Sequence, residues 1–239
     1  MRFNWNYIKF IILLTLIAGL YSYSTVKNDA RMIEDIQIRF LGDNDLYITE
    51  EAVNKLLIQN KDSITAVRKE ALDLNGLETA LKSNPMIKTA EVYLSVNGQV
   101  KADIKQRKPI ARVLTNASYY IDEDGLFMPL SGNRTARVPL VTGDILKNDL
   151  NNVYRVARKI QADEFLRFHV VEIIQHSDRS ISLKFRELDF EIVLGKVDKL
   201  DGKINNLKAF YQKARKDNAL KKYKKVNLTY ESQVVCTKK

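Results

Sequence analysis

Residues 84–113 constrain the fold more than any other stretch of this chain. Within them, apolar and polar side chains alternate on both sides of the turn-forming pair Asn97-Gly98. The apolar members of this alternation are Ala90, Val92, Leu94 and Val96 before the turn, and Val100, Ala102 and Ile104 after it. A period of two on both sides of turn residues predicts a β-hairpin with one buried face.

The register of this hairpin is restricted by its apolar residues. A two-residue loop at Asn97-Gly98 would place the two apolar sets on opposite faces of the sheet, which is incompatible with one buried face. A three-residue loop over residues 97–99, or an equivalent bulge, keeps both sets on the same face. The pairs expected in that register are Val96 with Val100, Leu94 with Ala102, and Val92 with Ile104.

Residues 10–26 are uncharged and predict a transmembrane helix at the short end of the spanning range. A cleaved signal peptide is the alternative, but the exit from this stretch lacks a small-x-small cleavage pattern, so we favour an uncleaved anchor. The expected order is a short tail over residues 1–9, the helix, and a stalk over residues 27–34. Arg2 and Lys9 favour a cytoplasmic N-terminus, which places the following residues on the far side of the membrane.

Residues 35–107 predict a small α+β domain. Residues 36–40 alternate as a strand, Thr49 is positioned to cap a helix that runs to Gln59, and residues 74–81 have the spacing of a second helix. With the hairpin, the order is strand-helix-helix-strand-strand. We expect the two helices to cover one face of a three-stranded sheet.

Residues 108–239 predict a β-rich domain with two helices, over residues 150–166 and 198–216. The expected strands cover residues 110–114, 119–121, 127–130, 138–141, 170–174, 180–185, 190–194, 226–230 and 234–236. The strands between residues 170 and 194 are expected to be successive and antiparallel. The fold class is therefore α+β, with one N-terminal transmembrane helix, a small mixed domain and a β-rich domain.

The sequence contains no phosphate-binding loop, dinucleotide fingerprint or Gly-x-Ser-x-Gly elbow. His169 and His176 lack a metal-ligand spacing, and we interpret both as structural. The acidic run at residues 122–125 fits a hairpin turn better than a calcium loop. Cys236, the only cysteine, fits a small strand residue. We predict no catalytic, cofactor-binding or metal-binding residue, although a carboxylate pair for glycan cleavage stays open.

The charge balance is basic, with 39 Lys and Arg residues against 29 Asp and Glu residues. Much of the excess lies in residues 196–225. Nucleic acid would account for this charge but not for the export signal, so we expect no nucleic-acid partner. An acidic partner helix, an anionic membrane surface and an ordinary solvated helix face remain open.

In this order, the parts of the chain resemble the FtsQ/DivIB family of bacterial cell-division proteins, which carry a POTRA domain followed by a β domain. The segments that resemble the family motifs are Asn84–Ile87, Ala90–Val92, Arg107–Ala111, Ile121–Gly125, Val138–Gly143, Val226–Tyr230 and Gln233–Val235. The resemblance implies that residues 35–107 are POTRA-like and that residues 108–239 are the β domain with a C-terminal edge strand. The chain departs from the family at Gln106, where an acidic residue is common, and at Thr229, where an arginine is common.

The resemblance implies a function in cell division without enzymatic activity. A protein of this family is a divisome scaffold in the bacterial inner (cytoplasmic) membrane, with periplasmic C-terminal domains at the division septum. It is expected to bind FtsB- and FtsL-like membrane coiled-coil proteins, to contact other divisome membrane proteins, and to help regulate septal peptidoglycan synthesis. No cofactor is implied.

The predicted partner-binding site lies near the C-terminus. A terminal edge strand offers unpaired N–H and C=O groups to which a partner segment can add. We expect that strand to comprise Tyr230, Glu231, Ser232, Gln233, Val234 and Val235, with Tyr230 as a half-buried aromatic anchor. The resemblance adds Arg179, at the position of a family arginine that pairs with a partner carboxylate. As structural alternatives, Tyr230 belongs to the core and Arg179 is only a turn residue.

Two other classes of function stay open. A POTRA-type docking or chaperone module for exported polypeptides would use the hairpin of residues 84–113 rather than the C-terminal strand. An accessory hydrolase or transferase of the cell wall would show turnover on peptidoglycan.

Overall fold

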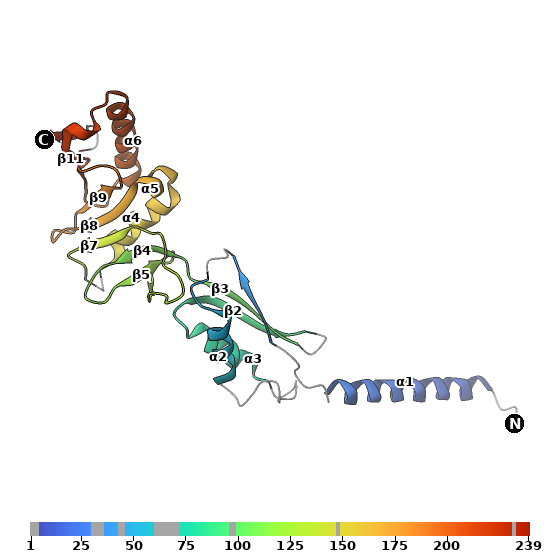
Figure 1. The fold of residues 1–239 in the computed structure, drawn as a ribbon. Helices are drawn as coiled ribbons and strands as arrows, with labels where there is room; N and C mark the ends of the chain where they lie inside the picture. The colour runs from blue at the N-terminus through green and yellow to red at the C-terminus, as the bar shows by residue number, and fades with distance from the viewer. Residues whose placement is uncertain are drawn as a thin grey trace. The chain divides into compact units, whose positions relative to one another are not determined.

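The structure is a computed structural model, and its chain divides into two compact units, Met1–Gln106 and Arg107–Lys239 (Figure 1). The residues that the structure describes are 5–29, 36–42, 46–59, 72–95, 99–146, 149–230 and 233–239.

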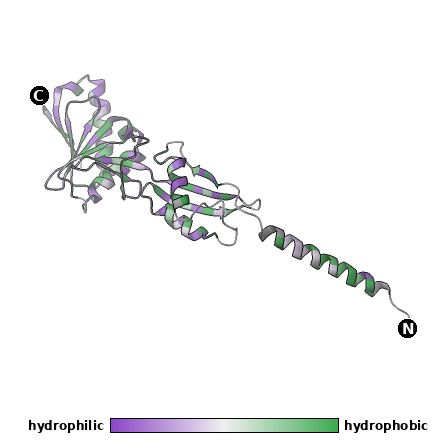
Figure 2. Ribbon diagram, turned by 60° about the horizontal axis from the view of Figure 1, so that its bottom comes forward, coloured by the Kyte–Doolittle hydropathy of each residue, from purple (hydrophilic) through white to green (hydrophobic). Residues whose placement is uncertain are grey.

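The first helix, α1 (Trp5–Asp29), is longer than the predicted span of residues 10–26. It contains a 20-residue stretch, Tyr7–Val26, that is long and apolar enough to cross a membrane. Figure 2 shows hydrophobic residues along much of this helix. The helix also takes in part of the predicted tail and the first residues of the predicted stalk, because nothing in these flanks breaks a helix. The rest of the predicted stalk, residues 30–34, lies outside the described part of the chain, and so does residue 35.

The first unit contains a three-stranded sheet and two covering helices. Its elements in chain order are β1 (Ile36–Leu41), α2 (Glu50–Gln59), α3 (Leu74–Lys82), β2 (Ile87–Leu94) and β3 (Val100–Gln106). The strand order is β1-β3-β2, with β3 antiparallel to β2 and parallel to β1. Figure 1 shows α2 and α3 on the same side of this sheet. The predicted α+β arrangement is confirmed.

Local side-chain hydrogen bonds explain where the two helices begin. The Ala52 N–H donates to the Thr49 hydroxyl at the start of α2 (3.2 Å), and the Gly76 N–H donates to the Asp73 carboxylate at the start of α3 (2.9 Å). Such caps satisfy donors that the first helical turn leaves unpaired. The buried core under these helices consists of Ile48, Val53, Leu57, Leu77, Leu81, Ile87, Ala90, Val92, Val100, Ala102 and Ile104.

The register of the β2–β3 hairpin corrects the predicted pairs. Leu94 lies opposite Val100, Val92 opposite Ala102, and Ala90 opposite Ile104, two residues away from the predicted partners. The Ser95 N–H donates to the Gln99 carbonyl oxygen (2.9 Å), so residues 96–98 make the connection rather than residues 97–99, and they lie outside the described residues. A shift by two leaves every side chain on its face, and the alternation alone therefore cannot distinguish the two registers.

The second unit contains a nine-stranded sheet in the order β12-β11-β10-β9-β8-β7-β4-β5-β6. Its strands are β4 (Pro109–Val113), β5 (Tyr119–Asp122), β6 (Phe127–Met128), β7 (Leu140–Gly143), β8 (Val170–Gln175), β9 (Ile181–Phe185), β10 (Glu191–Gly195), β11 (Tyr223–Asn227) and β12 (Val235–Lys238). The strands β8, β9 and β10 are successive and antiparallel, as predicted. The pair β10 and β11 is parallel, and a helical crossover connects them.

Three α-helices, rather than the two predicted, cover one face of this sheet in the described chain (Figure 1). They are α4 (Asn151–Ala162), α5 (Glu164–His169) and α6 (Leu200–Lys216), and a short 3-10 helix, η3 (Leu220–Lys222), follows α6. The predicted helix over residues 150–166 is divided at Asp163, whose backbone is extended and whose carboxylate accepts the Leu166 N–H (3.1 Å). Capping a new helix competes with continuing the old one, which the apolar periodicity does not reveal.

The carboxylate of Asp163 also holds α6 in place. Lys208 of α6 lies 2.5 Å from it. Burial raises the pKa of Asp163, but the hydrogen bonds from Lys208 and the Leu166 N–H outweigh this effect and lower the pKa overall. The buried core beneath the helices consists of Ile110, Ala111, Val113, Tyr119, Ile121, Val141, Val153, Val156, Ala157, Ile160, Leu166, Val170, Ile173, Ile181, Leu183, Phe185, Phe190, Ile192, Leu194, Val197, Ile204, Leu207, Val226 and Leu228.

A buried ion pair fixes the start of the second unit. Arg107 donates to the Asp122 carboxylate (2.7 Å), which also accepts the N–H groups of Asp124 (3.0 Å) and Leu126 (2.7 Å). Gly125 has a φ of +79° in this turn, a conformation that few other residues adopt. The acidic run is therefore a hairpin turn between β5 and β6, as expected. The Asp122 carboxylate accepts hydrogen bonds from Arg107 and from two backbone N–H groups of this turn.

Candidate partner-binding surface

The terminal edge strand of the nine-stranded sheet is β12. The prediction that residues 230–235 form this strand is wrong, because the strand begins at Val235 and extends to Lys238. The error arises at β11, which ends at Asn227 rather than continuing to Tyr230. Here the Asn227 carboxamide oxygen accepts both the N–H and the hydroxyl of Thr229 (2.9 and 2.8 Å), and this local turn takes the chain out of the strand.

The hydrogen-bond pattern shows which groups of β12 face outward. The Leu228 N–H donates to the Val193 carbonyl oxygen in β10 (2.8 Å), so the preceding residue of β11 directs its N–H toward β12. At the other end, the Lys239 N–H donates inward to the Lys222 carbonyl oxygen (2.9 Å). By alternation, the backbone N–H and C=O groups of Cys236 and Lys238 point away from β11. In the described part of the chain, no strand pairs with that outer edge.

The described residues of the predicted partner site lie at one end of this sheet. Arg179 is in the β8–β9 turn, and the register of β9, β10 and β11 places that turn at the same end as Tyr230 and the start of β12 at Val235. Tyr230 is 51% exposed, which makes it available to a partner rather than part of the core. Glu231 and Ser232 lie outside the described residues.

Arg179 is held in its turn by its backbone. Its φ is +65°, its N–H donates to the His176 carbonyl oxygen (2.9 Å), and its carbonyl oxygen accepts the Asn152 side chain (3.3 Å). Its Nε atom lies 3.0 Å from the Asp149 carboxylate, although the side chain is largely exposed. Arg179 is therefore a turn residue whose guanidinium is a charged group at the surface. A partner carboxylate would share this guanidinium with Asp149.

A groove of about 350 Å³ runs between α6 and the approach to β12. The lining residues are Asn206, Ala209, Phe210, Lys213, Ala214, Asp217, Tyr223, Gln233 and Val234. Two of them, Gln233 and Val234, belong to the predicted site, whereas the contribution of α6 was not predicted. The sequence contained a signal for it, because Ala209 and Lys213 are one turn apart on the helix, beside the apolar residue Phe210.

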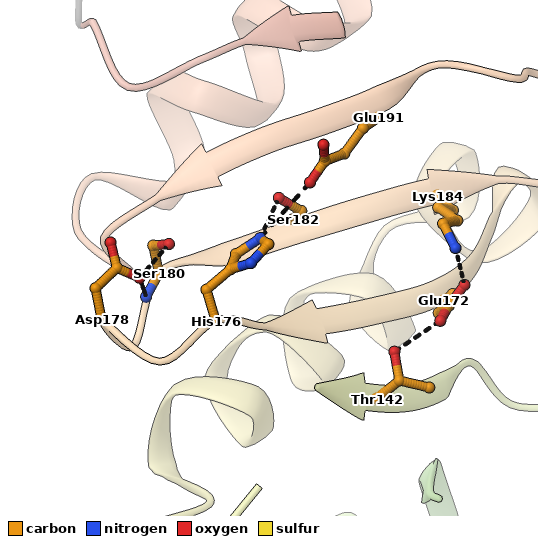
Figure 3. Close-up of polar contacts among 8 residues, drawn as sticks. All are labelled: Thr142, Glu172, His176, Asp178, Ser180, Ser182, Lys184 and Glu191. Atoms are coloured by element: carbon orange, nitrogen blue, oxygen red, sulfur yellow. Dashed lines mark hydrogen bonds and ion pairs between the residues drawn. The ribbon is translucent and has the colours of Figure 1, made fainter. Parts of the chain in front are cut away.

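The helix-free face of the sheet carries a row of polar contacts (Figure 3). The Thr142 hydroxyl and the Lys184 ammonium donate to the Glu172 carboxylate (2.6 and 2.8 Å). Burial raises the pKa of Glu172, but these two hydrogen bonds outweigh it and lower the pKa overall. Because these residues lie on three neighbouring strands, the contacts hold β7, β8 and β9 in register.

His176 does not form a nucleophile-activating arrangement with its neighbours. Its Nε2 atom lies 2.8 Å from the Ser182 hydroxyl and 3.6 Å from the Glu191 carboxylate, so one ring nitrogen faces both groups (Figure 3). A catalytic triad instead uses one nitrogen for the nucleophile and the other for the carboxylate. Within the described residues, no group of three or more His, Cys, Asp or Glu side chains is placed to hold a metal ion.

His169 and Cys236 are part of the packing. The His169 Nδ1 atom lies 2.8 Å from the Phe165 carbonyl oxygen and its Nε2 atom lies 3.2 Å from the Tyr211 hydroxyl, within an aromatic cluster that joins α5 to α6 and β9. Burial raises the pKa of the Cys236 thiol, which favours its protonated form.

Comparison with known sequence families agrees with this architecture. The family FtsQ/DivIB, C-terminal related, matches residues 108–237, which is more than half of the chain. A POTRA-like domain matches residues 34–105. No curated protein matches the chain. The two family matches cover the two units in the order expected from the sequence motifs.

The FtsQ/DivIB family comprises cell-division scaffolds without enzymatic activity, and a scaffold acts through protein–protein contacts in the divisome. The apolar helix α1 adds a single membrane pass to the POTRA-like and β-rich units. From its two matched domains and their order, this chain belongs to the FtsQ/DivIB family of cell-division proteins.

Proposed function

We propose that this protein captures membrane coiled-coil proteins of the FtsB and FtsL type by adding a partner segment to the outer edge of β12. In this proposal α1 spans the inner membrane with its N-terminus in the cytoplasm, and both folded units act in the periplasm at the septum. Capture there helps to regulate septal peptidoglycan synthesis, and the chain itself has no enzymatic activity.

The observation that carries the proposal is the outer edge of β12. The two outward-facing residues of β12, Cys236 and Lys238, present N–H and C=O groups in the geometry that pairs with a further strand. A strand added there gains backbone hydrogen bonds, and the groove against α6 offers a place for one row of its side chains. Tyr230 and Arg179, at the same end of the sheet, are suited to contact the part of the partner that leaves the edge.

The alternative of a docking site at the β2–β3 hairpin receives less support. The outer strand there is β2, and its Val92 N–H already donates to the Glu78 carboxylate of α3 (2.9 Å). A partner strand would have to displace this carboxylate before it could pair with β2. We therefore place partner capture in the second unit rather than in the POTRA-like unit.

The decisive variant removes an outward-facing donor and leaves the β11–β12 ladder intact. Cys236→Pro does this because the Cys236 N–H points away from β11, and proline is tolerated on edge strands. Cys236→Ala is the matched control, since it shortens the same side chain and keeps the N–H. Tagged full-length chains would be recovered from cells with their bound partners, and the coiled-coil proteins would be quantified by mass spectrometry.

We expect Cys236→Pro to reduce capture at least about tenfold, because the ring removes one donor and obstructs the incoming backbone. Cys236→Ala is expected to capture nearly as well as the wild type. Equal capture by both variants would refute edge addition. A role in division further predicts filamentous cells after depletion of the protein, and normally dividing cells would contradict it. Purified full-length chain is expected to show no turnover on peptidoglycan.

A further inference from the structure

The β12 edge differs in chemistry from one end to the other. It starts at Val235, which is 43% exposed and follows the groove residue Val234, and it ends at Lys238 and Lys239. The last of these lies against Lys222, to whose carbonyl oxygen it is hydrogen-bonded. A segment added to this edge would therefore meet an apolar region at one end and a strongly basic region at the other.

The basic region, which we call the lysine cluster, is built from α6, η3, β11 and β12. Its members are Lys213, Arg215, Lys216, Lys221, Lys222, Lys224, Lys238 and Lys239. All eight are exposed. Within the described residues, one member of the cluster forms an ion pair: the Lys239 Nζ atom lies 3.5 Å from the Asp189 carboxylate.

The fold itself accounts for only part of this charge. Lys213, Arg215 and Lys216 lie in the last turn of α6, where cations interact favourably with the helix dipole. No such benefit exists for the lysines of η3, β11 and β12. There the end of β12 lies beside η3 and the start of β11, so like charges on adjacent backbones repel each other. An acidic ligand would relieve this repulsion.

We propose that the segment captured by β12 carries two or more carboxylates at the end that lies beside the lysine cluster, and apolar residues at the end that lies beside Val234 and Val235. This inference rests on the proposed function, because it specifies the partner of that same edge. Antiparallel addition would place the carboxylates in the N-terminal half of the segment, and parallel addition in the C-terminal half. A polypeptide fits better than an anionic membrane, because lipid headgroups cannot pair with a strand edge.

The test measures peptide binding to the full-length chain in neutral detergent micelles by fluorescence anisotropy. Three labelled eight-residue peptides share a core of alternating Val and Thr, and they carry Glu-Glu at the N-terminus, Glu-Glu at the C-terminus, or Gln-Gln. We expect one acidic peptide to bind at least about tenfold more tightly than the other two at low salt. This advantage should shrink at high salt, where the Debye length falls to about 3 Å at 1 M.

Variants assign the effect to the lysine cluster. Lys222→Glu with Lys238→Glu is expected to remove the preference for the acidic peptide. Arg155→Glu with Arg158→Glu makes the same change in charge on the exposed face of α4, and it is expected to retain the preference. Both double variants change exposed side chains, so circular dichroism should show an unchanged fold.

The outcomes separate this inference from the proposed function. If all three peptides bind equally and Cys236→Pro abolishes their binding, edge addition stands and the acidic partner is refuted. If no peptide binds to the wild type, both proposals fail. The acidic partner is also refuted if Lys222→Glu with Lys238→Glu reduces binding to phosphatidylglycerol vesicles but leaves the peptide preference intact, because the cluster would then serve the membrane.

Discussion

The strands β2 and β12 are both outermost strands of their sheets, yet their outer edges differ. At β2, the Val92 N–H donates to the Glu78 carboxylate, which Lys82 also contacts at 2.8 Å. At β12, the described chain brings no side chain or strand to the outward-facing backbone groups, and the strand ends in lysines instead. One edge is therefore occupied from within the unit, and the other is left open.

This difference indicates how a chain with two sheets can avoid unintended pairing at their outer strand edges. An open strand edge is a hazard because any extended segment can add to it. At β2, the Glu78 carboxylate binds the outward Val92 N–H and so obstructs the addition of a strand there. Lysines at the end of β12 discourage addition of uncharged strands but would accept an acidic one, so the same device provides protection and selectivity.

The largest expected effects come from truncating the core behind each edge. Leu81→Ala in α3 and Leu207→Ala in α6 each remove a buried leucine, and each should lower the free energy of unfolding of its own unit by about 2–5 kcal/mol. Hydrogen exchange of peptides from each unit would measure this. We expect partner capture to fall only with Leu207→Ala, and equal loss with Leu81→Ala would place the binding edge elsewhere.

A smaller effect is expected at two glycines with positive φ. In Gly195→Ala, at the end of β10, the new Cβ would lie 2.5 Å from the Thr229 Cγ2 atom at a φ of +70°. We expect a loss of about 1–3 kcal/mol in stability together with reduced capture, because Thr229 leads to Tyr230. Adding Thr229→Ser removes that methyl group and should restore part of both.

The matched change in the first unit is Gly42→Ala. Gly42 has a φ of +107°, but among the described residues no atom lies within 4 Å of its added Cβ. The backbone strain alone should lower stability by about 1 kcal/mol and leave capture unchanged. Denaturant unfolding and capture assays would compare the two glycine variants. If Gly42→Ala impaired capture as strongly as Gly195→Ala, the contrast between the edges would be lost.

Glu78→Gln tests the occupied edge and should cost about 1 kcal/mol or less. The hydrogen bonds from Lys82 and from the Val92 N–H lower the pKa of Glu78. Its stabilising contribution is therefore present above the unfolded-state pKa of about 4.3 and disappears as the pH falls through the lower folded-state value. Unfolding measured against pH should show wild type and variant converging in acid, and a constant difference would contradict this assignment.

The smallest expected effect on stability is at Arg179. Arg179→Gly relieves a non-glycine φ of +65° but removes the guanidinium that contacts Asp149. We expect a change in stability of less than about 0.5 kcal/mol. Capture should weaken by about threefold if the guanidinium also meets a partner carboxylate. Binding measured by titration would check this, and unchanged capture would leave Arg179 as a turn residue only.

Much of the local structure follows from the sequence alone. Alternating apolar residues determined that residues 87–106 form a hairpin, the cap at Thr49 and the apolar spacing of residues 74–81 determined two helices, and an uncharged stretch determined a membrane-spanning helix. These signals are local, because a turn, a cap or a strand face depends on residues within a few positions of one another. The motif order was likewise sufficient to identify the family.

The tertiary structure decided what depends on distant residues. It selected the hairpin register, since a shift by two leaves the alternation unchanged. It also determined that β12 lies beside β11 at the edge of the sheet and that α6 completes the groove. Strand order and open edges result from pairing between segments far apart in the chain, and for this reason the sequence predicted an edge strand near the C-terminus but misplaced its residues.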